Sequence, residues 1–389
     1  MSRRIIIESG AAETRAALFI DNEVWKFWHG PARGDEALDA YPQAGQKFAG
    51  KVMRVDTSLN AAFVSIGGKA DGFLPITKSA ASHCVEGAMI AVEIKSPPRQ
   101  QKGAVLRFIE ALDHGAAPGR LPPFADAAFD AVQQLDALND DVIVDDGEVK
   151  KLLSQNGVAK VTHQSHGPSL FAQHGTEAEL GAAFCRSIAL QGGGVLTFDE
   201  NQALTSIDVD TAGLTASSSA RLREKIALAA ASEAVRQISL RNIGGHVVID
   251  FPKIQSDAAR KRFQHHLFKC LSMLDNLSSA GFSKSGLFSF TLPHKEASLL
   301  ERHTQPAQSQ PIAGRRFTSE FLAKRAIGEF ENRLRSHPSG RVVLKIGSEL
   351  DAVLKEHGQW SDRLRYKYGS RFELKPDAAC GERNYDLCE

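Results

Sequence analysis

The sequence predicts an α+β protein built from several domains, and three observations carry this prediction. The chain has 389 residues, of which 42% are hydrophobic and 24% charged, enough for two to four domains of roughly 100–200 residues each. From Gly45 onward, short alternating strands separated by turns indicate a small closed Greek-key barrel. Residues 205–250 have the pattern of a strand, a helix and a second strand.

The N-terminal segment predicts a small β-ribbon. RRIIIES and TRAALFIDNEVWKFWHG are strand-like runs joined by a Gly/Ala turn, with DNEV at a hairpin tip. A short linker is expected at Glu36–Tyr41.

One surface of the predicted barrel combines aromatic rings with cations. Phe63 and Phe73 are expected at opposite ends of a hairpin, flanked by Lys51, Arg54 and Lys102. Stacking rings beside phosphate-neutralising cations are typical of single-stranded nucleic acid binding. Propensity by itself favours both phenylalanines as core residues.

Two aspartates follow strand-like runs, Asp208 in ALTSIDVDTAG and Asp250 in IGGHVVIDFPKI. A carboxylate at the exit of a buried strand faces a cleft rather than the core. The segment between them has apolar residues at helical spacing and ends at Gly244–Gly245. This strand–helix–strand unit is expected to bring both carboxylates to one edge of one sheet.

An aspartate after a strand is often a turn or N-cap residue. Thr211 and the serines Ser217, Ser218 and Ser219 could cap the helix instead, which leaves Asp208 and Asp250 without an obvious structural role. Magnesium prefers oxygen ligands and is commonly held by one or two carboxylates plus substrate phosphate. Asp208 and Asp250 are therefore candidate ligands of a divalent cation such as Mg²⁺, with Asp210, on the same face of its strand, as an assisting ligand.

Long segments of the chain resemble the ribonuclease E/G family. They are FAGKVMRVDTSLNAAFVSIGGKADGFLPI, which is similar to that family's S1-like RNA-binding barrel, together with LQGGGVLTFDENQALTSIDVDTAG and AVRQISLRNIGGHVVIDF, which resemble its catalytic segment. The resemblance implies a magnesium-dependent endoribonuclease that cleaves single-stranded, A/U-rich RNA. It also implies catalysis by Asp208 and Asp250, and RNA contacts from Phe63, Phe73, Lys102 and Arg54.

The resemblance also suggests a domain order. It implies RNase H-like N-terminal strands at 1–40, the S1-like barrel at 41–115, a reduced sensor remnant at 116–190 and an RNase H/DNase I-like catalytic region at 191–303. A linker at 304–316, containing PAQSQP, leads to a small C-terminal α/β domain and tail at 317–389. The N-terminal strands are expected to pack with later segments, and the small domain to support a homo-oligomer.

Several positions depart from the family pattern. No Arg-Thr pair marks a 5′ sensor, and the paired cysteines after the catalytic region are missing, so a zinc-linked dimer is not supported. Gln202 stands where the family commonly has Glu, Ala227 where it has Asn, and GLFSFTLPH replaces an Arg-rich segment. Loss of such supporting polar groups commonly weakens metal affinity or activity about 10–100-fold.

Composition gives the remaining expectations. The net charge of +1 conceals basic stretches at Arg221–Lys225 and Arg260–Lys269, so nucleic acid remains a possible partner. No apolar run approaches a membrane span and the N-terminus lacks a signal-peptide pattern, so we expect a cytoplasmic protein. Cys84, Cys185 and Cys270 are predicted to be small buried hydrophobes. Cys380 and Cys388 lie in a terminal peptide expected to be mobile.

Two other functions are compatible with the same sequence. The first is a catalytically weak RNA-binding protein of the same fold, favoured by the Gln202, Ala227 and GLFSFTLPH departures. It predicts binding without cleavage. The second is a scaffold in an RNA-decay or ribosome-maturation complex, which predicts a stable partner whose loss abolishes function.

Overall fold

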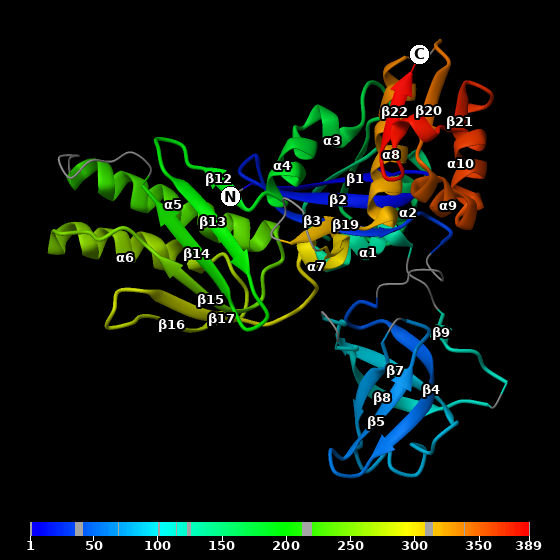
Figure 1. Cartoon of the computed structure of the whole chain (residues 1–389), viewed down its shortest axis with the longest axis horizontal. Coiled ribbons are helices and arrows are strands. Elements are labelled where there is room, and N and C mark those ends of the chain that lie inside the picture. Colours follow the sequence, from blue (N-terminus) through cyan, green and yellow to red (C-terminus); the bar gives the residue numbers. More distant parts are fainter. Residues whose placement is uncertain are drawn as a thin grey trace. The chain divides into compact units, whose positions relative to one another are not determined.

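A computed structural model describes residues 2–35, 42–68, 70–99, 102–113, 115–122, 126–211, 220–307, 314–337 and 339–388 (Figure 1). The chain forms two compact units. Unit 1 comprises 1–179, 303–305 and 317–389, and unit 2 comprises 180–302 and 306–316. The six domain ranges inferred from the sequence remain predictions.

The N-terminal strands belong to a five-stranded sheet in unit 1. Its order is β11-β10-β1-β2-β3. The strands are β1 (Arg3–Ser9), β2 (Glu13–Ile20), β3 (Glu23–Pro31), β10 (Asp141–Val144) and β11 (Lys160–His163). The predicted hairpin tip is confirmed, because Asp21 and Asn22 adopt positive φ values of 49° and 70° between β2 and β3.

The predicted N-terminal ribbon is part of a larger sheet. β1 pairs in parallel with β10, so Ile5 lies opposite Val142, and the N-terminal strands pack with a later segment as the resemblance implied. Isoleucines 5, 6 and 7 are each 0% exposed, since this strand is covered on both faces. The segment taken as a sensor remnant therefore contributes two strands to the N-terminal sheet.

Four short helices follow the barrel in sequence. They are α1 (Ala127–Gln134), α2 (Gly147–Gln155), α3 (Leu170–Gln173) and α4 (Thr176–Ala183). Asp126 caps α1 by accepting a hydrogen bond from the Ala128 N–H, and Asp146 caps α2 in the same way. These caps set where the helices begin against the N-terminal sheet.

The predicted barrel is present in unit 1. It consists of β4 (Lys47–Asp56), β5 (Ala61–Ser65), β6 (Gly72–Pro75), β7 (Met89–Ser96) and β8 (Val105–Ala111), with β9 (Gly119–Arg120) added beside β4. The order β5-β6-β8-β7-β4 closes because β4 also pairs with β5. Alternate residues such as Val52, Val64 and Ile94 fill its interior. Closure leaves the other face of each strand available for contacts.

The C-terminal module alternates helices and strands as predicted, with two additions. Its elements are α8 (Ser319–Ser336), β20 (Val342–Ile346), α9 (Ser348–Glu356), α10 (Gly358–Tyr368), β21 (Phe372–Pro376), a 3₁₀ turn at Ala378–Cys380 and β22 (Tyr385–Cys388). The sequence interpretation missed α10 and expected a mobile tail. Instead β22 pairs antiparallel with β20, placing Cys388 opposite Val343.

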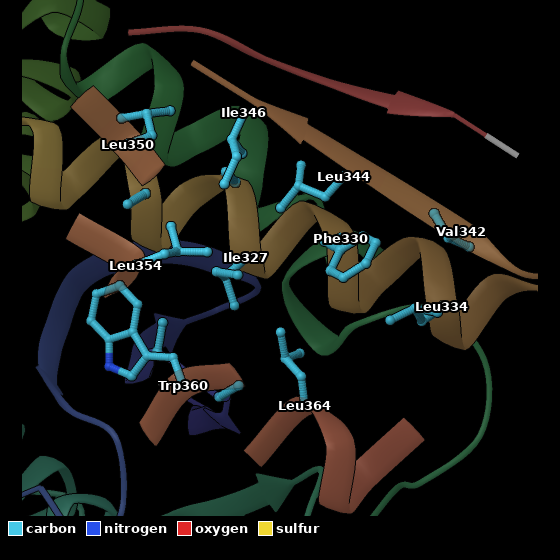
Figure 2. Packing of buried hydrophobic residues seen from close by; sticks show 14 residues of the cluster. Ile327, Phe330, Leu334, Val342, Leu344, Ile346, Leu350, Leu354, Trp360 and Leu364 are labelled. Atoms are coloured by element: carbon cyan, nitrogen blue, oxygen red, sulfur yellow. The ribbon is translucent and has the colours of Figure 1, made fainter. Parts of the chain in front are cut away.

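One hydrophobic cluster joins this module to the N-terminal turn. Figure 2 shows Phe330 and Leu334 of α8 packed among Leu344 of β20 and Leu364 of α10. Ala11 and Ala12, from the turn between β1 and β2, belong to the same cluster. The C-terminal module is therefore part of unit 1 rather than a detached appendage.

Buried charges cross the same region of unit 1. Arg15 donates to Glu8 at 2.8 Å, pairs with Glu177 and lies 4.2 Å over the ring of Phe171. Glu8 is 5% exposed and Arg15 is 9% exposed, so this is an interior ion pair. Burying such an ion pair costs desolvation free energy, and removing one partner leaves the other as an uncompensated buried charge.

Glu13 gives unit 1 a predictable acid sensitivity. Burial opposes its ionisation, but the hydrogen bond and charge of His29 prevail, and its pKa falls from 4.5 to about 2. A carboxyl group whose pKa is depressed on folding adds stability above its unfolded pKa, and that stability is lost as pH falls towards the folded pKa.

We therefore expect the unfolding free energy to drop between about pH 4.5 and pH 2, by roughly 3 kcal/mol from this group. Glu13→Gln should flatten that part of the pH profile in denaturant titrations. The exposed Glu23, changed to Gln, is the control and should leave the profile unchanged. An equally steep acid limb in Glu13→Gln would contradict the assignment.

Unit 2 is a six-stranded sheet with two long helices. The strand order is β12-β13-β14-β15-β17-β16. The strands are β12 (Ser187–Ala189), β13 (Val195–Glu200), β14 (Thr205–Asp210), β15 (Gly245–Asp250), β16 (Ser278–Phe282) and β17 (Phe288–Leu292), and the helices are α5 (Ala220–Leu240) and α6 (Asp257–Leu271). Figure 1 shows α5 and α6 beside each other along this sheet.

Short elements complete the chain near the predicted linker. They are α7 (Leu299–His303), β18 (Thr304–Pro306) and β19 (Arg315–Phe317), and β18 pairs with β19. The middle of the predicted linker lies outside the described residues. Among the helices described, none has the length and apolar character needed to cross a membrane. Cys84 is buried as predicted, whereas Cys185 is exposed, so its prediction as a core residue is wrong.

Candidate functional site

The two predicted aspartates are neighbours across a pair of parallel strands. Asp208 on β14 is the register partner of Asp250 on β15. Paired strands lie about 4.8 Å apart, so the two side chains leave the sheet next to each other. The helix between the strands was predicted from its apolar spacing, and the structure describes it as α5, Ala220–Leu240.

Alternation along each strand decides which face carries the carboxylates. Ile207 and Val209 are 1% and 7% exposed and flank Asp208, which points to the opposite, exposed face. Ile249, which is 0% exposed, has the same relation to Asp250. The helices take the apolar face, and the carboxylates are thereby left on the open face of the sheet.

That open face is polar on both sides of the carboxylate pair. Thr197 on β13 is the register partner of Asp208, and its hydroxyl lies 3.0 Å from the hydroxyl of Ser187. On the far side, His246 Nδ1 lies 3.0 Å from Thr291 Oγ1. The sequence interpretation did not single out these residues, although period-two alternation in the strands would have placed them on this face.

Asp199 differs from the two central aspartates because it is already neutralised. Arg186 donates two hydrogen bonds to its carboxylate, at 2.6 and 2.9 Å, and this pairing lowers the pKa of Asp199. Asp208 and Asp250 have no such cation or donor within the part of the chain that the structure describes. Two adjacent unpaired carboxylates repel each other, and a cation between them relieves that repulsion.

The donor set suits a hard divalent cation. Magnesium accepts one or two carboxylates and fills its remaining positions with water and phosphate oxygens. Within the described residues, no group of three or more His, Cys, Asp or Glu side chains could hold a metal ion. A metal at this place would therefore be held mainly by Asp208 and Asp250, completed by water and substrate.

Asp210 lies two residues beyond Asp208 on the same exposed face. Its register partner is Val195, and it is about 6.6 Å further along the strand. Its role as a third ligand remains a prediction. Ser217, Ser218 and Ser219, considered as helix caps, lie outside the described residues, whereas Thr211 is described and half-buried.

The two phenylalanines of the barrel lie closer together than the sequence suggested. Phe63 on β5 and Phe73 on β6 are direct register partners rather than residues at opposite ends of a hairpin. Their ring centroids are 6.0 Å apart at an interplanar angle of 73°. Both are half-buried and neither belongs to the barrel core, so the core interpretation is wrong. Strand alternation puts them on the outer face.

One cation lies against this pair of rings, and two other basic residues are exposed on the same barrel. The Arg54 guanidinium lies 4.4 Å over the ring of Phe63, its register partner on β4. Phe73 donates its N–H to the Ala104 carbonyl at 2.7 Å, and Lys102, two residues before Ala104, is exposed. Lys51 is exposed on β4, opposite Ser65. We call Phe63, Phe73, Arg54 and Lys102 the barrel platform.

Comparison with known proteins agrees with the folded arrangement. The sequence model of the ribonuclease E/G family matches residues 128–292, which include both carboxylates and the helix between them. The chain is thus similar to the ribonuclease E/G family over this segment. Over 176 residues it is 28% identical to ribonuclease G of Escherichia coli (strain K12), an alignment covering 44% of this chain and 35% of that protein.

Other relatives show the same extent of similarity. Ribonuclease G of Salmonella typhimurium (strain SL1344) is 31% identical over 138 residues, 34% of this chain and 28% of that protein. Ribonuclease E of Haemophilus influenzae is 25% identical over 308 residues, 52% of this chain and 33% of its own length. The chain thus spans about a third of the length of these curated relatives.

The departures from the ribonuclease E/G pattern fall at different depths in unit 2. Gln202 is exposed in the turn between β13 and β14, whereas Ala227 is 0% exposed inside α5. The stretch GLFSFTLPH supplies β17, in which Phe288, Phe290 and Leu292 are buried. Two of the three departures therefore serve packing.

Proposed function

We propose that this protein is a magnesium-dependent endoribonuclease that hydrolyses single-stranded, A/U-rich RNA. The observation that carries the proposal is the register pairing of Asp208 with Asp250 on an exposed, polar sheet face. The match of residues 128–292 to the ribonuclease E/G family and the names of the relatives, ribonuclease G and ribonuclease E, support the reaction class.

The chemistry follows from the positions of the side chains. Asp208 and Asp250 supply anionic oxygens at one point of the open face, and this is where a divalent cation and a phosphate can be held together. Magnesium bound there would polarise the scissile phosphate and activate a water molecule for in-line attack. The strands fix both carboxylates through their backbone pairing, so little ordering is left to substrate binding.

The domain identities belong to the same proposal. We assign the barrel of β4–β8 to an S1-like RNA-binding fold, unit 2 to a DNase I-like catalytic region and the N-terminal sheet to an RNase H-like fold. The closed barrel order and the exposed barrel platform support the first assignment. We further propose that the C-terminal module supports self-association.

The barrel platform offers a separate binding prediction. Stacking of a base on an aromatic side chain contributes about 1–3 kcal/mol per base. Phe63→Ala or Phe73→Ala should therefore weaken binding of a short single-stranded RNA by about 10-fold or more, with unfolding midpoints close to native because both rings lie outside the core. Fluorescence anisotropy with labelled RNA measures this.

Val85→Ala is the control for the platform variants. Val85 is an apolar residue of the same barrel that is 61% exposed, so its truncation should leave RNA affinity unchanged. Native affinity in both phenylalanine variants would remove the barrel platform from the proposal.

The proposed activity is tested by incubating the purified chain with 5′-labelled A/U-rich single-stranded RNA, with magnesium or with EDTA. We expect internal cleavage products with magnesium, none with EDTA, and recovery when magnesium is restored in excess. Tight RNA binding without products under any of these conditions would contradict the nuclease and favour an RNA-binding protein of the same fold.

A further inference from the structure

A basic groove lies in unit 2 between the beginnings of the two long helices. Its volume is about 860 Å³, and residues from 220–228 and 253–262 line it. The charged residues of its lining are five cations and one carboxylate: Arg221, Arg223, Lys225, Lys253, Arg262 and Glu224. The excess of positive charge indicates an anionic ligand.

Part of this charge is already used within the protein. Arg262 donates two hydrogen bonds to Glu224, at 2.8 and 2.9 Å, which ties α6 to α5 across the groove. Lys225 and Lys253 are exposed, and neither has a carboxylate partner within the described part of the chain. These two ammonium groups are therefore available to an external anion, while the Arg262–Glu224 pair links the two helices that form the groove.

Chain topology places the groove at the same sheet edge as the carboxylate pair. β14 and β15 are parallel, and α5 and α6 begin after their carboxyl ends. In open α/β sheets ligands bind outside the carboxyl ends of the strands. Lys253 follows Asp250 by three residues, so at most about 11 Å of chain separates them.

The other wall of the groove also approaches the end of β14. A Cβ added to Gly192 would lie 4.0 Å from Lys225 Nζ, so this ammonium group reaches the loop that precedes β13. In the same loop, a Cβ added to Gly194 would lie 3.0 Å from the Asp210 carbonyl oxygen. Lys225 thus stands beside the loop packed on the last residue of the carboxylate-bearing strand.

We propose that this groove binds the phosphate backbone of the RNA strand beside the bond that is cleaved, with Lys225 and Lys253 each contacting a phosphate. The inference rests on the proposed function, because the strand held at Asp208 and Asp250 is the polyanion that reaches this edge. Two ammonium groups, one from α5 and one from the segment before α6, can each contact a different phosphate of a polyanionic chain.

The test measures RNA affinity of the full chain in EDTA, where no cleavage is expected, as a function of salt concentration. For a single strand, each lost phosphate contact makes the negative slope of log K against log salt shallower by about 0.7. The double variant Lys225→Ala/Lys253→Ala should therefore lose about 1.4 from the slope and bind roughly 10-fold more weakly at 0.1 M salt.

A charge-matched control distinguishes phosphate contacts in the groove from the general electrostatic attraction between the protein and RNA. Lys269, in the last turn of α6, and Lys284, in the β16–β17 turn, are exposed lysines of unit 2 outside the groove. Lys269→Ala/Lys284→Ala should keep the native slope and affinity. A native slope in the groove variant, or an equal loss in the control variant, would overturn the proposal.

Neutral phosphates give a direct readout of the contact. Single methylphosphonate substitutions along the RNA should weaken binding to the native chain at two or more positions, and binding to the groove variant should be insensitive at those positions. Equal sensitivity of both proteins at every position would also overturn the proposal.

These results can be separated from a failure of the proposed function. If the native chain does not cleave RNA but the groove variant still loses its salt slope, the groove assignment stands and the nuclease assignment falls. If the native chain cleaves RNA and the groove variant binds with native slope, the groove assignment falls alone.

Discussion

Replacing Asp208 with asparagine is expected to reduce magnesium-dependent RNA cleavage at least about 100-fold. Removing a group that only supports a metal ligand already costs about 10–100-fold, so removing one of two carboxylate ligands should cost no less. Asp250→Asn should have a similar effect, because the two residues are register partners on the same exposed face. Initial cleavage rates of a labelled single-stranded RNA measure both effects.

The double variant tests whether the two carboxylates act as one site. Residues that form a unit are strongly non-additive, so Asp208→Asn/Asp250→Asn should be about as inactive as either single variant. Losses that multiply in the double variant would contradict a shared site. Asp275→Asn is the control, since Asp275 is exposed in unit 2 and pairs with Lys295 at 3.0 Å, outside the carboxylate pair.

Thermal unfolding gives a readout that does not depend on activity. Like charges directly opposite each other on neighbouring strands are destabilising. Without metal, Asp208→Asn should therefore unfold at the native temperature or slightly above it. Magnesium should raise the unfolding temperature of the native chain and of Asp275→Asn. The increase should be much smaller for Asp208→Asn. An Asp208→Asn variant that unfolds well below the native chain would indicate a structural role instead.

Replacing Arg15 with methionine is expected to destabilise unit 1 by about 3–5 kcal/mol. The guanidinium bridges Glu8 and Glu177 and lies over Phe171, and its removal leaves the 5%-exposed Glu8 as an uncompensated buried charge. Denaturant titration monitored at the transition of unit 1 measures the loss.

A second substitution separates the cost of an uncompensated buried charge from the cost of lost packing. Adding Glu8→Gln to Arg15→Met removes the uncompensated carboxylate, so the double variant should be more stable than Arg15→Met alone. Arg341→Ala is the control, because its pair with Glu373 is a surface ion pair worth about 0–1 kcal/mol. A loss in Arg15→Met no larger than in Arg341→Ala would contradict the interior role of this pair.

Local patterns in the sequence were sufficient for many elements of this protein. The apolar spacing in 220–240 predicted α5, and the period-two pattern after Gly45 predicted the barrel strands. The same patterns failed where a strand forms only by pairing with a segment distant in the sequence. No local signal showed that the terminal peptide ending at Cys388 forms β22, because its partner β20 lies some forty residues earlier.

The barrel platform also combines features that the sequence predicted with features that only the tertiary structure decided. Composition identified Phe63, Phe73 and the nearby cations, since aromatic and basic residues alternate with apolar ones in that stretch. Whether the rings face the core or solvent, and whether they touch, depends on strand register, and a shift of one residue would turn both rings inward. The tertiary structure placed them opposite each other on the outer face.

By itself the sequence indicated that Asp208 and Asp250 belong to two apolar strands connected by a helix, although Asp208 lies inside β14, which continues to Asp210, and only Asp250 ends its strand. It also determined the basic character of 221–225 and 260–269. Only the tertiary structure decided that the two carboxylates are exact partners and that the basic segments face each other across a groove. The physical reason is that a helical crossover fixes the handedness of a parallel pair but not its register, which packing of the whole sheet selects.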